Sequence, residues 1–184
     1  MPLFPLIEKN LIDINDRIVI DSKSGISGAG RKESAQYLFA ERNDNTLGYA
    51  IFNHRHRYEI AEKLAVSWDK ILFTPHLIPT IRGIESTIYV KINKNVSFED
   101  IKKCLNTYYQ NSYFVKIVDF IPSTSIVKGT NNIAIYIACE NDNLIISCVI
   151  DNICKGSSGC AIQSMNINFD FKEDAGLNFL QSYI

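Results

Sequence analysis

The feature of the sequence that most constrains the fold is a pair of long apolar segments, residues 133–139 and 144–150, joined by four polar residues. Both segments are rich in β-branched side chains, and the Glu-Asn-Asp-Asn connection between them is typical of a β-hairpin. Because the apolar residues follow one another without regular alternation, both faces of these strands must be covered. A single helical layer covers one face, and we therefore expect a second copy of the chain to cover the other.

One strand and one helix have especially regular patterns. Residues 86–93 alternate between apolar and polar side chains, which predicts a half-buried antiparallel strand. Ser97 and Asp100 have the spacing of a capping box, and apolar residues then recur at helical spacing up to residue 110. We expect this helix to lie over the sheet.

The remaining elements are expected to be short, because turn-forming residues separate them. Together they predict an α+β fold with a mostly antiparallel sheet and with helices on one face. Further strands are expected at residues 17–21, 71–74 and 114–120, and further helices at residues 33–42 and 156–168.

Charge and composition exclude several classes of function. The 184 residues include 19 Lys and Arg against 20 Asp and Glu, so the chain has no overall positive field that would gather nucleic acid. No apolar run approaches the roughly 20 residues of a membrane-spanning helix, and Glu8 and Lys9 interrupt the first run too early for a signal peptide. The five cysteines form no Cys-x-x-Cys pair. We expect a cytoplasmic protein that binds no metal ion, nucleic acid or membrane.

A glycine- and serine-rich segment, residues 22–30, follows the first predicted strand. Gly25 and Gly30 superficially match the spacing of a nucleotide phosphate loop, but that loop needs a lysine and a hydroxyl where this chain has Arg31 and Lys32. This mismatch excludes a kinase or an NTPase. The segment can present backbone N–H groups to an anion beside Arg31, or it can be a plain surface loop; composition leaves both interpretations open.

Two of the three histidines flank an arginine, as His54, Arg55 and His56. This density of titratable and anion-binding groups is typical of a functional site, and Glu59 has the helical spacing that would let it orient His56. A metal site is disfavoured, because the two rings would point to different sides of a helix and no nearby cysteine or carboxylate set completes the ligands. By itself the segment also fits a solvated helix start.

Taken in order, five motifs resemble the N-acetyl-γ-glutamyl-phosphate reductases of arginine biosynthesis. They are DSKSGISGAGRK at 21–32, HRH with Glu59 at 54–59, TPHL with Arg82 and Gly83 at 74–83, KGTN at 128–131, and DN with KG at 151–156. The resemblance implies a domain shared with semialdehyde and glyceraldehyde-phosphate dehydrogenases. Residues 1–150 would form this catalytic and dimerisation domain. Residues 151–184 would add a helix that packs toward an N-terminal dinucleotide-binding domain.

The family reaction reduces an acyl phosphate to an aldehyde with NADPH. In that reaction a cysteine thiolate forms a thioacyl intermediate and a histidine acts as general acid/base. The resemblance assigns the acid/base role to His54. It further assigns substrate binding to Arg31, Arg55, His56 and Arg82, a supporting role to Glu59, and contacts with the nicotinamide end of NADP to Ser24, Gly25 and Asn152.

The chain departs from the family pattern at several points. The nucleophilic Gly-Cys motif would precede the segment that resembles residues 3–10, where this chain has Met1, and the nucleotide-binding fingerprint is missing too. Tyr58 replaces a usual proline, and Cys160 replaces a usual glutamine. We expect the C-terminal portion of the enzyme, inactive by itself and a homo-oligomer, with a separately encoded N-terminal half as a further partner. The alternative is a noncatalytic remnant or dimerisation module.

Overall fold

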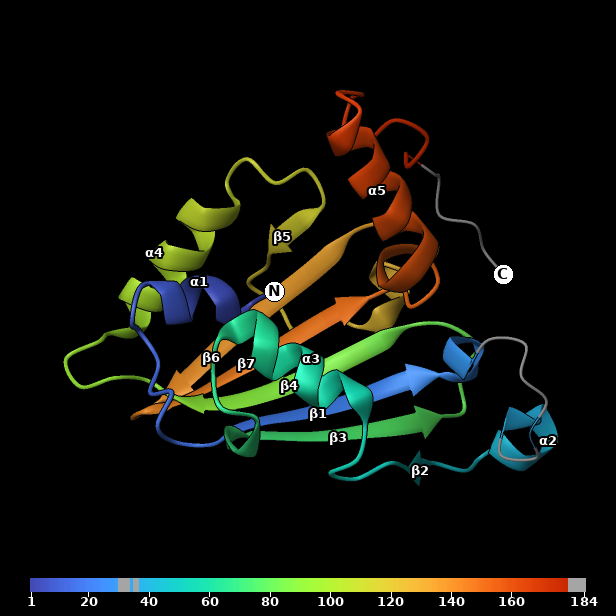
Figure 1. The fold of residues 1–184 in the computed structure, drawn as a ribbon, viewed down its shortest axis with the longest axis horizontal. Helices are drawn as coiled ribbons and strands as arrows, with labels where there is room; N and C mark the ends of the chain where they lie inside the picture. The colour runs from blue at the N-terminus through green and yellow to red at the C-terminus, as the bar shows by residue number, and fades with distance from the viewer. Residues whose placement is uncertain (30–33, 35–36, 179–184) are drawn as a thin grey trace.

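A seven-stranded sheet forms the centre of the computed structural model, which describes residues 1–29, 34 and 37–178 (Figure 1). The strand order is β2-β3-β1-β4-β7-β6-β5. The strands are β1 (Ile18–Gly25), β2 (Leu47–Gly48), β3 (Ile71–Ile78), β4 (Ile84–Lys91), β5 (Val115–Ile117), β6 (Ile133–Glu140) and β7 (Asn143–Ile150). The α-helices are α1 (Leu3–Glu8), α2 (Phe39–Arg42), α3 (Arg55–Leu64), α4 (Phe98–Tyr109) and α5 (Gly159–Asn168). Shorter helical turns are η1 (Ile26–Ala29), η3 (Trp68–Lys70), η4 (Thr124–Ile126) and η5 (Cys154–Ser158).

The α+β class and the β6–β7 hairpin are confirmed, but the sheet is mixed rather than mostly antiparallel. β4 and β6 both pair antiparallel with β7, as the apolar pattern indicated. β1 pairs parallel with β3, and β5 pairs parallel with β6. The chain between β1 and β3 passes through α3, and such a crossover returns the chain to the same end of the sheet. Hairpins join antiparallel strands only, so the predicted hairpins did not indicate these parallel pairs.

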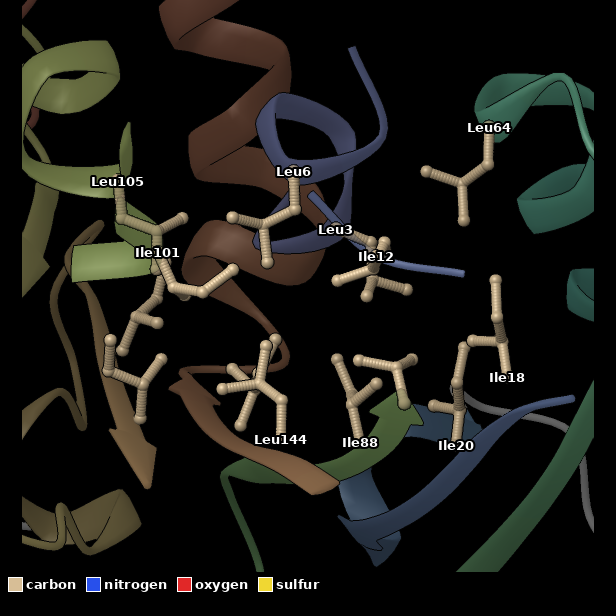
Figure 2. Packing of buried hydrophobic residues seen from close by; sticks show 14 of the residues in the cluster. Leu3, Leu6, Ile12, Ile18, Ile20, Leu64, Ile88, Ile101, Leu105 and Leu144 are labelled. Atoms are coloured by element: carbon tan, nitrogen blue, oxygen red, sulfur yellow. The ribbon is translucent and has the colours of Figure 1, made fainter. Parts of the chain in front are cut away.

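Helices α1, α3 and α4 cover one face of the sheet, and the main core lies between this layer and the strands (Figure 1). Leu6 of α1 and Ile101 and Leu105 of α4 are fully buried, and Figure 2 shows them on the helix side of the cluster, above Leu144 of β7. The predicted capping box starts α4, because Ser97 Oγ accepts the Asp100 N–H and the Asp100 carboxylate accepts the Ser97 N–H.

Strands β1 and β3 are longer than the ranges predicted from the sequence, residues 17–21 and 71–74. β1 continues through the glycine- and serine-rich residues to Gly25, and β3 continues through Pro75 to Ile78. The carbonyl of Pro75 accepts the Tyr49 N–H on the side of the two-residue strand β2. Since the nitrogen and the carbonyl of one strand residue point the same way, the missing N–H of Pro75 faces this short edge strand and breaks no bond to β1.

The second face of the sheet is covered at one end and exposed in its middle. Val149 of β7 and Ala134 of β6 are buried with Val127 at the covered end. In the middle, register places an apolar row across five strands, which we call the outer row. The outer row consists of Leu72, Val19, Tyr89, Ile145 and Ala138. Tyr89 and Ile145 are 43% and 41% exposed, so this row is available to another surface.

No helix among the described residues is both long and apolar enough to cross a membrane.

Adjacent residues of β7 offer a matched test of this layer arrangement. Ile146 is fully buried in the core, whereas Ile145 points to the second face. We expect Ile146→Ala to lower the free energy of unfolding of the monomer by about 2–5 kcal/mol, because it leaves a cavity, and Ile145→Ala to lower that of the monomer by less than about 1 kcal/mol. Urea unfolding measures both values. Equal losses for the two variants would contradict the assigned faces.

Candidate active site

Three segments that are distant in the sequence meet where β1, β3 and β7 end (Figure 1). We call this region the carboxyl edge; it comprises residues 24–29, 80–83 and 151–154. The backbone N–H of Gly25 donates to the Gly83 carbonyl at 2.9 Å, and the N–H of Ile26 donates to the Thr80 carbonyl at 2.9 Å. These bonds tie the end of β1 to the turn between β3 and β4.

Asp151, directly after β7, is the central acceptor of the carboxyl edge and is fully buried. Its Oδ1 accepts the N–H groups of Ile153 and Cys154 at 2.8 Å each, and its Oδ2 accepts the N–H of Gly129 at 2.7 Å. The Arg82 guanidinium pairs with both oxygens, at 3.0 Å from Nε and 3.1 Å from Nη2. Burial acts to raise the pKa of Asp151, but the three N–H donors and Arg82 outweigh burial and hold it below its ordinary value.

Arg82 is therefore engaged within the protein. Its side chain is 15% exposed, and besides Asp151 it contacts the Cys154 Sγ, which lies 3.3 Å from Nη2. The structure gives this arginine a role in holding the turn between β3 and β4 against the end of β7. The substrate-binding role suggested by the resemblance stays a prediction.

Asn152 joins the other two segments of the carboxyl edge. Its Oδ1 accepts the backbone N–H of Gly83 at 2.7 Å, and its Nδ2 donates to Ser27 Oγ at 2.9 Å. The side chain is buried, so both amide groups are satisfied inside the fold. The end of β7 is thereby fastened to η1 as well as to the turn after β3.

Ser24 and Gly25, predicted with Asn152 to approach a cofactor, lie at the same edge. A Cβ on Gly25 would be 2.7 Å from the Ile81 carbonyl oxygen, so only glycine allows this close approach. A Cβ on Gly28 would be 3.0 Å from Ser24 Oγ and 3.4 Å from Asn152 Nδ2. The structure thus brings the three predicted cofactor contacts together, although it does not test their role.

His54 is the N-cap residue of α3. Its backbone is extended, and its Nδ1 accepts the backbone N–H of His56 at 3.2 Å. The imidazole makes edge contacts with the rings of Tyr49, at 5.6 Å between centroids, and Phe73, at 5.2 Å. Partial burial, followed by the neighbouring His56 and Arg55, lowers the pKa of His54.

The other residues of the predicted cluster are more exposed. His56 Nε2 lies 3.8 Å from Glu59 Oε2, so the expected pairing is present, with both side chains about half or more exposed. Arg55 is also exposed at the first position of α3. Arg31 lies outside the described residues. Among those that are described, no group of three or more histidines, cysteines or carboxylates is arranged to hold a metal ion.

Arg57 is a positioning residue that no motif in the sequence indicated. It is 7% exposed, its Nε donates to the Ile71 carbonyl at 2.8 Å, and its Nη1 donates to the Phe52 carbonyl at 3.3 Å. Its guanidinium also lies 4.9 Å from the Trp68 ring centroid. These contacts fix the first turn of α3, and with it His54, against the start of β3. Nothing in the sequence distinguishes Arg57 from the exposed charged residues beside it, so its burial could not be predicted.

The buried and half-buried thiols are poor nucleophiles. Burial raises the pKa of Cys104, Cys139 and Cys154, and it raises the pKa of Cys148 to about 11. The pKa of Cys154 is raised further by the neighbouring Asp151. Since the thiolate is the reactive form, none of these four cysteines has the environment of an activated nucleophile.

The fold matches that of the larger part of solved aspartate-semialdehyde dehydrogenases. The aspartate semialdehyde dehydrogenase II from Vibrio cholerae complexed with ASA aligns with a TM-score of 0.69 and 14% identity, over 92% of this chain and 59% of that chain. A probable aspartate-semialdehyde dehydrogenase from Pseudomonas aeruginosa aligns over 92% of this chain and 59% of that one, with a TM-score of 0.66 and 14% identity. At this identity the comparison concerns the fold.

The family model of the semialdehyde dehydrogenase dimerisation domain matches residues 1–152, and the chain belongs to this family. Curated N-acetyl-gamma-glutamyl-phosphate reductases of Staphylococcus aureus strains USA300 and COL are 43% identical over 185 residues, or 97% of this chain. The chain covers 54% of those relatives, about half of their length. The resemblance drawn from the five motifs is thereby confirmed.

The Asp151 arrangement leads to a stability prediction. We expect Asp151→Asn to lower the free energy of unfolding by about 3–5 kcal/mol, because it leaves Arg82 without its buried counter-charge. The matched control is Asp142→Asn, which removes an exposed ion pair with Lys91 and should change stability little. Chemical denaturation of both variants measures the difference. Similar losses for the two would show that Asp151 is an ordinary surface charge.

The same substitution predicts a pH dependence. Because the folded-state pKa of Asp151 is depressed, its stabilising contribution is present above the ordinary value of 3.8 and is lost as the pH falls through the folded-state pKa. The stability gap between the wild-type chain and Asp151→Asn should therefore narrow on acidification below about pH 4. A gap that stays constant down to the acid-unfolding region would contradict the assigned pKa direction.

Proposed function

We propose that the chain is the C-terminal portion of an NADP-dependent N-acetyl-γ-glutamyl-phosphate reductase, a cytoplasmic oxidoreductase of arginine biosynthesis that reduces an acyl phosphate to an aldehyde. The observation that carries this proposal is the 43% identity to curated reductases of that name along 97% of the chain. The satisfied polar contacts of the carboxyl edge and the capped His54 support it. Since the relatives are about twice as long, the chain supplies about half of such an enzyme.

In this proposal the nucleophilic cysteine belongs to a segment that meets the start of α1. The Met1 carbonyl accepts the Tyr109 hydroxyl at 2.8 Å, and burial lowers the pKa of the Met1 amino group, which lies near Cys148 of β7. The start of α1 therefore lies over the helix-covered face of the sheet. A nucleophile delivered there shares that face with His54.

The small residues of the carboxyl edge fit the nicotinamide end of NADP. Ser24 is half-buried and Gly28 is exposed, so a flat ring can approach the backbone without meeting large side chains. The cofactor supplies the hydride when bound. Tight binding also needs pyrophosphate and adenosine contacts, and we assign those to the N-terminal half.

The proposed roles on this side are acid/base chemistry by His54 and anion binding by its neighbours. Arg55 and His56 are exposed beside His54, where they can meet the phosphate of the substrate. Glu59 would orient His56, while Arg31 and Arg82 are further candidates for anion binding. The exposed apolar residues of α5, such as Met165 and Ile167, would face the dinucleotide-binding half.

The second candidate function is a noncatalytic remnant or dimerisation module. The exposed outer row favours it, because a module of this kind needs a pairing surface. The two candidates differ in what happens when an N-terminal half is supplied, and this difference can be measured.

A complementation assay tests the proposed reaction. We expect phosphate-dependent NADP reduction with N-acetyl-glutamate semialdehyde to be undetectable for the chain alone and to appear when a separately produced N-terminal half is added. In the mixture, His54→Ala should lower turnover by roughly 10²–10⁴-fold, the range of general acid/base catalysis. His76→Ala is the matched control, since His76 lies on the opposite face of β3 from Phe73. Turnover by the chain alone, or a mixture without turnover, would overturn the proposal.

Self-association through the outer row is a separate prediction. We expect light scattering to give a homodimer at micromolar concentration, and Ile145→Lys to shift it toward the monomer by placing a charge in the apolar row. Ile167→Lys, at an exposed position of α5, should leave the mass unchanged. A monodisperse wild-type monomer would count against this interface.

A further inference from the structure

We propose that Phe120 and Ile121 of one copy of the chain insert into a groove over the outer row of a second copy, and that the second copy makes the same contact in return. The inference concerns assembly, goes beyond the proposed reaction and does not depend on it. It adds to the predicted homodimer the segment that each copy places against the outer row of the other.

Residues 118–127, which we call the crossing segment, connect one edge of the sheet to its middle. At the first end, the N–H of Val118 donates to the Ile135 carbonyl of β6 at 2.9 Å and so continues the pairing of β5 with β6. At the other end, Thr124 lies beside the turn that precedes β4, since a Cβ on Gly83 would be 2.7 Å from the Thr124 Cβ. The segment therefore has to pass β6 and β7, which lie between β5 and β4 in the sheet.

Buried side chains place the crossing segment on the second face of the sheet. Val127 is buried together with Ala134 of β6 and Val149 of β7, and Val118 packs against the same cluster. Pro122, in the middle of the segment, is buried as well. These side chains anchor the segment to the strands, so the exposed side chains between them point away from the sheet.

Phe120 and Ile121 lie between these anchors, and we call the two residues the knob. They are 52% and 75% exposed, and two adjacent large apolar side chains with this exposure are available to another surface. Because Val118 and Pro122 hold the backbone on either side, little conformational entropy remains to be lost when the knob binds.

The outer row forms the floor of a groove farther along the same face. Val19, Tyr89, Ala138 and Ile145 line this groove, which has a volume of about 520 Å³. Its lining also includes charged residues, namely Arg17, Lys91 and Glu140. An apolar centre with a polar rim is typical of a contact between proteins.

One two-fold axis brings the knob of each copy to the groove of the other. The crossing segment packs at Ala134 and Val149, and the groove lies four residues away on the same two strands, at Ala138 and Ile145. An axis between these positions, parallel to the sheet and perpendicular to its strands, places each strand over the same strand of the other copy in the opposite direction. The two contacts are then equal, and the assembly closes at two copies.

A second copy is the occupant of the groove that the observations favour. The family model that matches residues 1–152 describes a dimerisation domain. The knob and the groove are both apolar and lie on one face, so a symmetric contact removes both of them from water. A partner with a different sequence would cover the groove and leave the knob exposed.

Charge complementation tests this contact, with the mass measured by light scattering. We expect Ile121→Lys and Ile145→Glu each to be monomeric at a concentration where the wild-type chain is dimeric, because either homodimer would bury unpaired charges. An equimolar mixture of the two variants should form a heterodimer, since one of its contacts pairs the two charges and the other is unchanged. Its dissociation constant should be lower by roughly tenfold or more than that of either variant alone.

The matched control is Ile167→Lys, which adds the same charge at an exposed position of α5. It should be dimeric by itself, and mixing it with Ile145→Glu should give none of this gain. Urea unfolding of each variant shows that it is folded, as expected for changes at exposed positions.

Each outcome decides the proposal. An Ile121→Lys variant as dimeric as the wild-type chain would overturn the contact and leave another arrangement of the outer rows. A mixture of the Ile121→Lys and Ile145→Glu variants that stays monomeric would also overturn it. A monomeric wild-type chain would overturn the homodimer together with this contact. Turnover is measured separately, so a failure of the proposed reaction would be distinguished from a failure of this contact.

Discussion

The buried carboxylate of Asp151 holds the turn after β3, the loop before β6 and the segment after β7 together. A buried charge is costly unless it is paired and hydrogen-bonded, and this one has three backbone donors and a two-point contact with Arg82. Those partners come from the loop before β6, the turn after β3 and the segment after β7. Satisfying one carboxylate therefore fixes three segments, and Asn152 extends the connection to η1.

Local patterns in the sequence predicted those helices and strands that residues close together in the chain determine. The alternation of residues 86–93 predicted β4, and Ser97 with Asp100 predicted the start of α4. Pro75 was wrongly expected to end its strand, because the cost of proline depends on which neighbour its nitrogen faces. The Arg82–Asp151 pair joins residues 69 positions apart and has no local signature. For the candidate site, family motifs identified the residues, and the structure supplied their partners.

The start of α3 places His54 in a capping position. Tyr58, the fourth residue of the helix, keeps a backbone N–H that a proline at this position would lack. The helix begins at Arg55, and His54 Nδ1 accepts the backbone N–H of His56. A residue proposed for chemistry thereby also stabilises its own helix, and its free nitrogen is set by backbone geometry.

Asp151 organises the carboxyl edge in the chain by itself. Native-state hydrogen exchange of the amides of Gly129, Ile153 and Cys154 tests this organisation, because these three N–H groups donate to that carboxylate. We expect them to exchange only through global unfolding, with the same free energy as the core amides of β7. Exchange through local openings of much lower free energy would show that the carboxyl edge is not organised without a partner.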